Sequence, residues 1–154
     1  MNRASLPAER ILLALGLGSL ALILGALGFQ YLAHIEPCEM CHWQRWPHIA
    51  AAFLGIGGVS LARGQARNMA WIVVILIVIS GLIGAYQTGM QLGILPGPQA
   101  CSVAHPYVMG SNVEPEVQCN VVTWSLFGLS LATYNAIFSF LLAGTAAVLL
   151  GKRK

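Results

Sequence analysis

Four long apolar runs constrain this chain more than any other feature of its sequence. They extend over about residues 11–33, 44–62, 69–93 and 126–150. A helix needs roughly 20 mainly apolar residues to cross the hydrocarbon core of a bilayer. The runs are continuous rather than alternating, which argues against the strands of a membrane β-barrel. The sequence therefore predicts an all-α, integral membrane four-helix bundle that forms a single domain over residues 1–154.

The second run is the shortest, and it reaches a spanning length only if its helix begins near Gln44. Pro47 permits this start, because the first four N–H groups of a helix have no partner within the helix. Trp46 precedes the proline and is biased away from helical backbone angles. We therefore expect this helix to begin at about residue 44, just after Cys41.

The composition agrees with a membrane protein and excludes several other classes. Hydrophobic residues make up 57% of the chain and charged residues only 8%, whereas soluble domains carry about 25% charged residues. The net charge of +3 is small, and no basic stripe with interleaved aromatic residues is present, so a nucleic-acid partner is not expected. The chain contains no aspartate, which excludes acid–base chemistry by an aspartate dyad.

The basic residues predict the orientation of the bundle. Seven of the eight fall before the first run, between the second and third, or after the fourth: Arg3, Arg10, Arg63, Arg67, Lys152, Arg153 and Lys154. Because short cytoplasmic loops are rich in lysine and arginine, we expect both termini in the cytoplasm of a bacterium and the other face in the periplasm. The periplasmic loops would then cover about residues 34–43 and 94–123.

The predicted periplasmic side holds a distinctive set of residues. It includes Arg45, the glutamates Glu36, Glu39, Glu114 and Glu116, the histidines His34, His42, His48 and His105, and all four cysteines. Cys38 and Cys41 belong to the first loop, and Cys101 and Cys119 belong to the second. An even number of cysteines in an oxidising compartment favours disulfides.

The spacing Cys38-x-x-Cys41 is typical of a reactive dithiol. Such a pair has one cysteine of low pKa, which a helix N-terminus and a nearby cation provide. Cys41 is expected just before the second helix, and Arg45 follows it by four residues. The pattern therefore favours thiol–disulfide chemistry at the outer face of the membrane.

Other readings of the same cysteines remain open at this point. A non-enzymatic membrane protein with two structural disulfides has the same cysteine count. Cys38-x-x-Cys41-His42 also matches the attachment site of a c-type haem, which would make the chain a membrane-anchored cytochrome. Zinc is a third alternative, but the distance between Cys101 and Cys119 in the sequence is not that of common zinc ribbons, so no metal site is predicted.

Three segments of the chain resemble one known family. They are Pro37-Cys38-x-x-Cys41-x-x-Gln44-Arg45, Pro96-Gly97-Pro98-x-x-Cys101, and Cys119-x4-Trp124-x-Leu126-Phe127-Gly128-Leu129. Together they are similar to the disulfide bond formation protein B (DsbB) family, membrane quinone reductases that reoxidise a periplasmic thioredoxin-fold oxidase. The resemblance implies a protein-disulfide:quinone oxidoreductase that makes disulfides de novo, with ubiquinone or menaquinone from the membrane pool as cofactor and a DsbA-like protein as partner.

The resemblance also implies a role for each cysteine. Cys101 and Cys119 would form the loop disulfide that the soluble partner attacks, with Cys101 taking the mixed disulfide. Cys38 and Cys41 would then accept the electrons, with the Cys41 thiolate facing the quinone. Arg45 matches the family's arginine at the quinone site, where its charge would stabilise both the thiolate and the reduced quinone.

One position departs from the family pattern. Many relatives carry a histidine and then an acidic residue near the end of the third helix, where this chain has Gln87 and Gln91. An amide donates a hydrogen bond but cannot act as an acid near neutral pH. Gln87 is therefore predicted only as a possible hydrogen-bond donor to the quinone.

Overall fold

The computed structural model describes residues 7–61, 64–98, 101 and 118–152. Within these residues it contains α1 (Ala8–Tyr31), α2 (Glu39–Leu61), α3 (Ala66–Gln91), β1 (Ser125–Leu126), β2 (Leu129–Ser130) and α5 (Leu131–Gly151). The all-α prediction is confirmed, because the two strands have only two residues each and form one small hairpin. Predicted loop and terminal residues that lie outside the described part are Arg3, Arg63, His105, Glu114, Glu116, Arg153 and Lys154.

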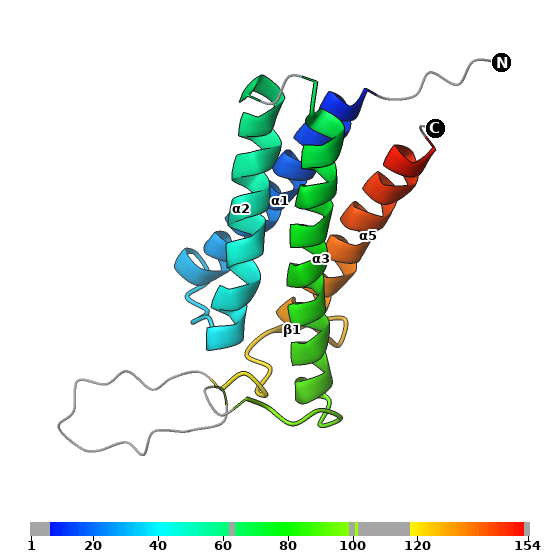
Figure 1. Cartoon of the computed structure of the whole chain (residues 1–154). Helices are drawn as coiled ribbons and strands as arrows, with labels where there is room; N and C mark the ends of the chain where they lie inside the picture. The colour runs from blue at the N-terminus through cyan, green and yellow to red at the C-terminus, as the bar shows by residue number, and fades with distance from the viewer. Residues whose placement is uncertain (1–6, 62–63, 99–100, 102–117, 153–154) are drawn as a thin grey trace.

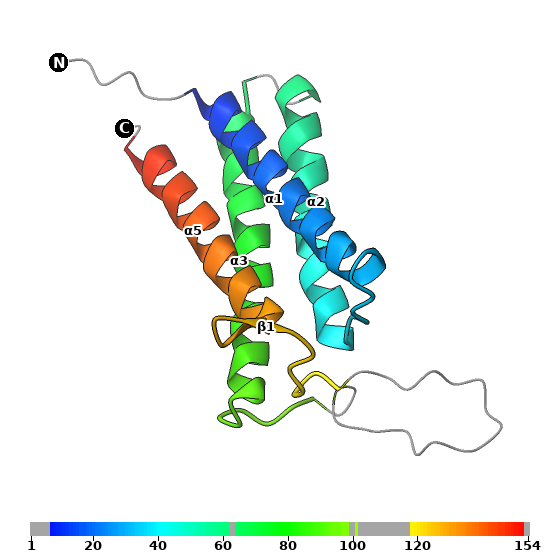
Figure 2. The same cartoon turned by 180° about the vertical axis from the view of Figure 1, so that it is seen from behind.

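The four long helices of the described chain pass alternately up and down (Figure 1). The start of α1 and the end of α5 lie at one end of the bundle, and the start of α2 and the end of α3 lie at the other (Figure 2). Helices α1, α3 and α5 are each long and apolar enough to cross a membrane, judged by length and composition. Large apolar side chains face outward, including Phe53, which is 78% exposed. Lipid tails, unlike water, accommodate such a surface without cost.

Helix α2 begins earlier than the sequence predicted. It starts at Glu39 rather than near residue 44, so Cys41 lies within its first turn and Pro47 lies inside the helix. The predicted start relied on proline being confined to the first turn. In a membrane helix, neighbouring helices and polar side chains pair with the backbone groups that a proline frees, so an internal proline is tolerated.

Helix α5 begins later than predicted, at Leu131 rather than near residue 126. Residues Ser125 to Ser130 instead form the β1–β2 hairpin. Its two central residues, Phe127 and Gly128, have φ angles of 51° and 77°, the left-handed values that a tight two-residue hairpin turn requires. Ser130 then caps α5, because its hydroxyl accepts a hydrogen bond from the N–H of Thr133 at 3.3 Å.

Helix α3 ends in a glycine turn that directs the chain toward the first loop. Gly93 has a φ of +71°, which suits a residue without a side chain. The N–H of Ile94 bonds to the carbonyl of Gly89 at 2.9 Å, and that of Gly93 bonds to Met90 at 3.0 Å, the pattern of a Schellman motif. The hydroxyl of Tyr86 then donates to the carbonyl of Pro96 at 2.7 Å. This hydrogen bond holds the segment after α3 against the helix.

Helices α1 and α2 make backbone contact where two glycines face each other. A Cβ atom placed on Gly16 would lie 2.8 Å from the carbonyl carbon of Gly55, and one on Gly55 would lie 2.7 Å from the nitrogen of Gly16. Small residues allow this approach, which is a common means of packing helices in lipid. The close crossing brings the second half of α1 beside α2, where Ala26 and Gln30 meet Arg45.

We predict that Gly55→Ala destabilises the bundle by about 1–3 kcal/mol, the usual cost of overpacking a tight contact. The matched control is Gly57→Ala on the same helix, where a Cβ atom meets nothing within 4 Å. Titration with SDS in mixed micelles, followed by circular dichroism, measures both. Equal stability of the two variants would show that the glycine contact does not hold α1 against α2.

Candidate redox site

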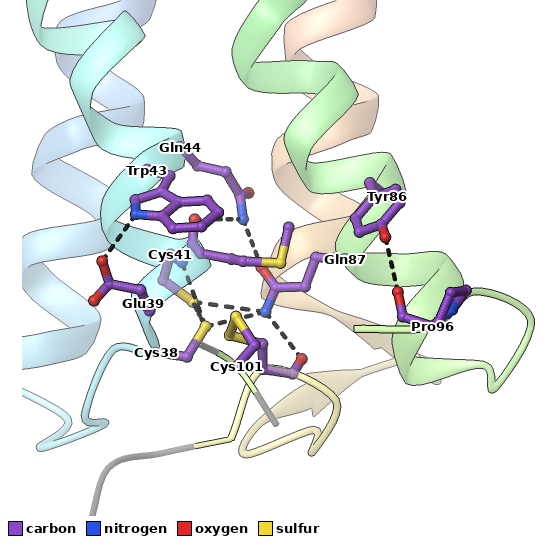
Figure 3. The surroundings of a disulfide bond; sticks show 11 residues. Cys38, Glu39, Cys41, Trp43, Gln44, Tyr86, Gln87, Pro96 and Cys101 are labelled. Carbon is purple, nitrogen blue, oxygen red and sulfur yellow. Dashed lines mark hydrogen bonds between the residues drawn. A yellow bond between two sulfur atoms is a disulfide. The ribbon is translucent and has the colours of Figure 1, made fainter. Parts of the chain in front are cut away.

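All four cysteines meet at one end of the bundle. Cys101 and Cys119 are joined by a disulfide across 18 residues and pack in one buried cluster with Cys38, Met40 and Met90. Cys101 is 4% exposed and Cys119 is fully buried. The second loop is therefore anchored directly against the start of α2 (Figure 3). The sequence predicted two pairs in separate loops, and the structure brings them together.

Cys38 caps the N-terminus of α2. Its carbonyl accepts a hydrogen bond from the N–H of His42 at 3.2 Å, and its sulfur accepts one from the N–H of Cys41 at 3.3 Å. Both cysteines are free thiols, and their sulfurs are 2.7 Å apart. At that distance the pair needs no movement of the backbone to form or break a bond.

The two thiols have opposite pKa shifts. Cys41 lies in the first turn of α2, ahead of the apolar part of the helix, which begins at Ile49. The hydrogen bond from the Cys38 thiol, helped by a backbone hydrogen bond from Cys38, by Gln87 and by the charge of Arg45, lowers the pKa of Cys41 to about 6 despite burial. The same hydrogen bond, followed by burial, raises the pKa of Cys38. The pair therefore holds one proton and one negative charge near neutral pH.

Arg45 projects from α2 toward α1. Its guanidinium donates to the side-chain oxygen of Gln30 at 2.6 Å and to the carbonyl of Ala26 at 3.5 Å. Glu39, on the same helix, accepts from the indole N–H of Trp43 at 2.8 Å. These contacts hold the guanidinium next to Cys41 on the wall of a cavity.

The cavity has a volume of about 450 Å³ and is lined by all four long helices. Cys41, Gln44, Arg45 and His48 of α2 form one wall. The opposite walls are mainly apolar and come from α1 and α5, with Ala26, Phe29, Tyr134 and Phe138 among them. An apolar cavity with a few convergent polar groups is the usual form of a small-molecule site.

Gln87 lies between the two cysteine pairs and is 2% exposed. Its side-chain nitrogen donates to the sulfur of Cys38 at 3.1 Å and to the carbonyl of Cys119 at 3.3 Å. Its oxygen accepts from Gln44 at 2.6 Å. Its predicted contact with a quinone stays a prediction, but the amide is already engaged by both redox loops. Gln91 lies one turn later and accepts from the hydroxyl of Ser130 at 2.6 Å.

The sequence grouped His48 with the residues of the periplasmic side, but the structure places it inside the bundle, where it is 2% exposed. Its ring contacts Ser19 of α1 at 3.4 Å and Ser139 and Asn135 of α5 at 3.1 Å each. Sequence reasoning missed this group of buried polar contacts. Polar residues within the apolar runs were a signal for it, since polar side chains in membrane helices face the interior.

No group of three or more histidine, cysteine or acidic side chains among the described residues could hold a metal ion.

Comparison with known proteins identifies one family. The model of the family described as "Disulfide bond formation protein DsbB" matches residues 8–149. A protein of Dechloromonas aromatica named disulfide bond formation protein B is 31% identical, with 98% of this chain and 96% of that protein covered. A protein of the same name from Aromatoleum aromaticum is 30% identical over 92% and 93% of the two chains. No solved structure matches the chain significantly.

We predict that Cys41 of the fully reduced protein is alkylated with a pH midpoint near 6, because its thiolate is stabilised by Cys38, Gln87 and Arg45. Iodoacetamide labelling over a pH series, read by mass spectrometry of the peptide, measures the midpoint. Cys38→Ala removes the largest cause and raises the pKa of Cys41. A midpoint equal to that of an ordinary cysteine in the unaltered protein would contradict this geometry.

Proposed function

The chain belongs to the DsbB family, and from this premise we propose that it oxidises a soluble dithiol protein and delivers the electrons to a membrane quinone. It is a multi-pass membrane protein and a disulfide-forming oxidoreductase. The comparisons give no support to the c-type cytochrome or the structural-disulfide scaffold. The proposal concerns the parts of the activity that the family name leaves open: the donor, the acceptor and the residues.

One observation carries the proposal: a buried disulfide and a low-pKa dithiol touch each other beside an apolar cavity. The Cys101–Cys119 disulfide packs in one cluster with Cys38, with Cys41 beside it, and both cysteines of the pair line the cavity together with Arg45. The two sulfurs differ in that Cys38 is a buried member of the loop cluster, whereas the charge of Arg45 lowers the pKa of Cys41. Cys38 is placed for exchange with the loop, and Cys41 is placed for electron delivery to a ligand in the cavity.

Thiol–disulfide exchange between these pairs balances without another reagent. A partner thiolate attacks Cys101, breaking the Cys101–Cys119 bond, and the partner's second thiol then completes its own disulfide and leaves two loop thiols. The Cys119 thiolate attacks Cys38 of an oxidised Cys38–Cys41 pair and releases Cys41 as a thiolate. Cys101 then attacks Cys119, restores the loop disulfide and releases Cys38. Two electrons and two protons have moved from the partner to the pair.

At the end of this sequence the disulfide would lie on the loop and both thiols on α2. Cys101 is buried here, which suits internal exchange rather than contact with a soluble partner. The partner is expected to be a thioredoxin-fold protein of the DsbA kind, because such oxidants have potentials near −120 mV and need a strong acceptor to be regenerated.

The cavity fits a quinone head group. Its volume and largely apolar lining suit a planar ring, and Arg45 supplies a cation beside Cys41. Residues of α1 and α5 on the facing walls would hold the ring. A quinone bound there supplies electron acceptance, while the chain supplies position and charge. Arg45 would bind and orient a carbonyl oxygen of the ring, and the apolar walls would exclude water from the Cys41 thiolate.

The orientation follows from the distribution of basic residues and completes the proposal. Arg10, Arg67 and Lys152 lie at the end of the bundle opposite the cysteines. The positive-inside rule places that end in the cytoplasm of a bacterial inner membrane. The cysteines then face the periplasm, where the soluble partner is found.

The direct test is reoxidation of a reduced thioredoxin-fold oxidase by the purified protein with added quinone. We expect quinone-dependent disulfide formation in the partner. Cys101→Ser should abolish reaction with the partner, because its attack site is lost, yet leave Cys38 and Cys41 oxidisable by quinone. Absorbance of the quinone and alkylation of the partner are the two measurements. A Cys101→Ser protein that still exchanges at full rate would refute the order of the relay.

We predict that Arg45→Gln weakens quinone binding and raises the pKa of Cys41, because both depend on the guanidinium charge. Loss of a charge-assisted contact costs about 1.5–3 kcal/mol, or about a 10- to 150-fold change in affinity. Arg45→Lys should be intermediate, since it keeps the charge but not the planar fork. Quinone titration by fluorescence quenching measures the effect, and Arg67→Gln at the far end of the bundle is the control. Normal affinity in Arg45→Gln would make the arginine only an interfacial anchor.

A further inference from the structure

A layer of polar side chains crosses the bundle next to the redox site. Each of the four long helices contributes to it: Ser19 from α1, Gln44 and His48 from α2, Ser80 and Gln87 from α3, and Asn135 and Ser139 from α5. Most of these side chains are 6% exposed or less. Polar groups buried among lipid-facing helices are costly unless paired, and here the pairs form a continuous network of hydrogen bonds, which we call the hydrogen-bonded chain.

Backbone carbonyls fix the orientation of every side-chain amide in the hydrogen-bonded chain. A carbonyl only accepts hydrogen bonds, so the NH₂ group of each amide must face it. Gln87 faces the carbonyl of Cys119 at 3.3 Å. Gln44 faces that of Met40 at 3.2 Å, and Asn135 faces that of Ser80 at 3.3 Å. None of the three side chains can turn over without losing this contact.

With the amides fixed, all the hydrogen bonds point the same way. Oδ1 of Asn135 can only accept, so Nε2 of His48 is the donor in that contact at 3.1 Å, and Nδ1 of the neutral ring then accepts from the hydroxyl of Ser19 at 3.4 Å. The NH₂ of Asn135 donates to Gln44 at 2.8 Å, and that of Gln44 donates to Gln87 at 2.6 Å. The NH₂ of Gln87 ends the chain at the sulfur of Cys38. Hydrogen bonds in such a chain polarise and strengthen one another.

The hydrogen-bonded chain ends at the sulfur where negative charge develops during exchange. When Cys101 attacks Cys119 in the mixed disulfide, the Cys101–Cys119 bond forms and the Cys38–Cys119 bond breaks. Cys38 leaves with the electron pair as a thiolate. The amide of Gln87 touches both the departing sulfur and the backbone of Cys119. A pre-oriented donor at such a position lowers the barrier to charge separation.

We propose that Gln87 is a catalytic residue of disulfide exchange, which stabilises the negative charge that the Cys38–Cys41 pair takes up as Cys38 leaves, while holding Cys119 beside it, and that Gln44 and Asn135 are positioning residues that fix its amide. The inference rests on the proposed relay between the cysteine pairs but does not depend on the identity of the quinone or the partner. It assigns to Gln87 a role at sulfur in place of a role at the quinone.

The first test measures where one disulfide resides when the protein holds two thiols and no quinone is present. Differential alkylation and mass spectrometry give the ratio of the Cys101–Cys119 form to the Cys38–Cys41 form. Gln87→Leu should shift this ratio about 10-fold or more toward the Cys38–Cys41 disulfide, the effect of losing a hydrogen bond to a charged group. Thr88→Val, on the next residue and away from the sulfurs, should leave the ratio unchanged.

The second test uses ultraviolet titration of the thiolate in a Cys101→Ser, Cys119→Ser background. Gln87→Leu should raise the first ionisation of the Cys38–Cys41 pair by about one pKa unit or more. Gln44→Leu should give a smaller rise, and adding it to Gln87→Leu should give none, because Gln44 acts only through Gln87. If Gln87→Leu does not fold, Gln87→Asn, whose shorter amide cannot reach the sulfur, serves in its place.

These outcomes separate the inference from the proposed function. An unchanged disulfide ratio and an unchanged titration in folded Gln87→Leu or Gln87→Asn would overturn the role of Gln87. Independent, additive shifts for Gln44 and Gln87 would overturn the positioning chain. Failure of the unaltered protein to oxidise a thioredoxin-fold partner with quinone would refute the proposed function, while both quinone-free results would stand.

Discussion

A reactive thiol at the edge of a bilayer must carry negative charge on sulfur with little water to solvate it. In this protein, hydrogen-bond donors replace that water. The Cys38 thiol donates to the sulfur of Cys41 at 2.7 Å, the amide of Gln87 reaches both sulfurs of the pair, and Arg45 adds a positive charge near Cys41. The fold depends on this requirement, because the donors come from different helices and must be brought to one point.

The architecture around the cysteines can be understood as the means of assembling those donors. The early start of α2 makes Cys38 a helix cap and places Cys41 in the first turn. The glycine turn after α3 and the bond from Tyr86 to Pro96 return the second loop to the same point. The Gly16–Gly55 contact draws α1 close enough for Gln30 to hold Arg45. Each of these features is local, but the site exists only when all are present.

The sequence predicted the helices and the cysteine pairs because those depend on composition and spacing. It failed where packing decides. Rules drawn from soluble helices put Pro47 in a first turn, whereas surrounding helices allow it inside α2. The hairpin before α5 was missed because Phe127 adopts a left-handed conformation that few non-glycine residues take. The contacts of Gln87 with sulfur depend on two loops meeting, which no pattern within one helix could indicate.

The two sulfurs of the Cys38–Cys41 pair, although 2.7 Å apart, face different chemical environments. Both cysteines line the cavity, but Cys38 is a buried member of the cluster of the loop disulfide and contacts the amide of Gln87 at 3.1 Å, whereas Cys41 is the sulfur whose pKa the charge of Arg45 lowers. Exchange with the loop disulfide requires direct contact between the two cysteine pairs, whereas electron delivery to a lipid-soluble acceptor requires a dry cavity. A pair that shares one proton across so short a distance meets both requirements, because charge released on one sulfur is available at once on the other. The close approach of the two thiols therefore joins the periplasmic chemistry to the membrane chemistry without any movement of the helix that carries them.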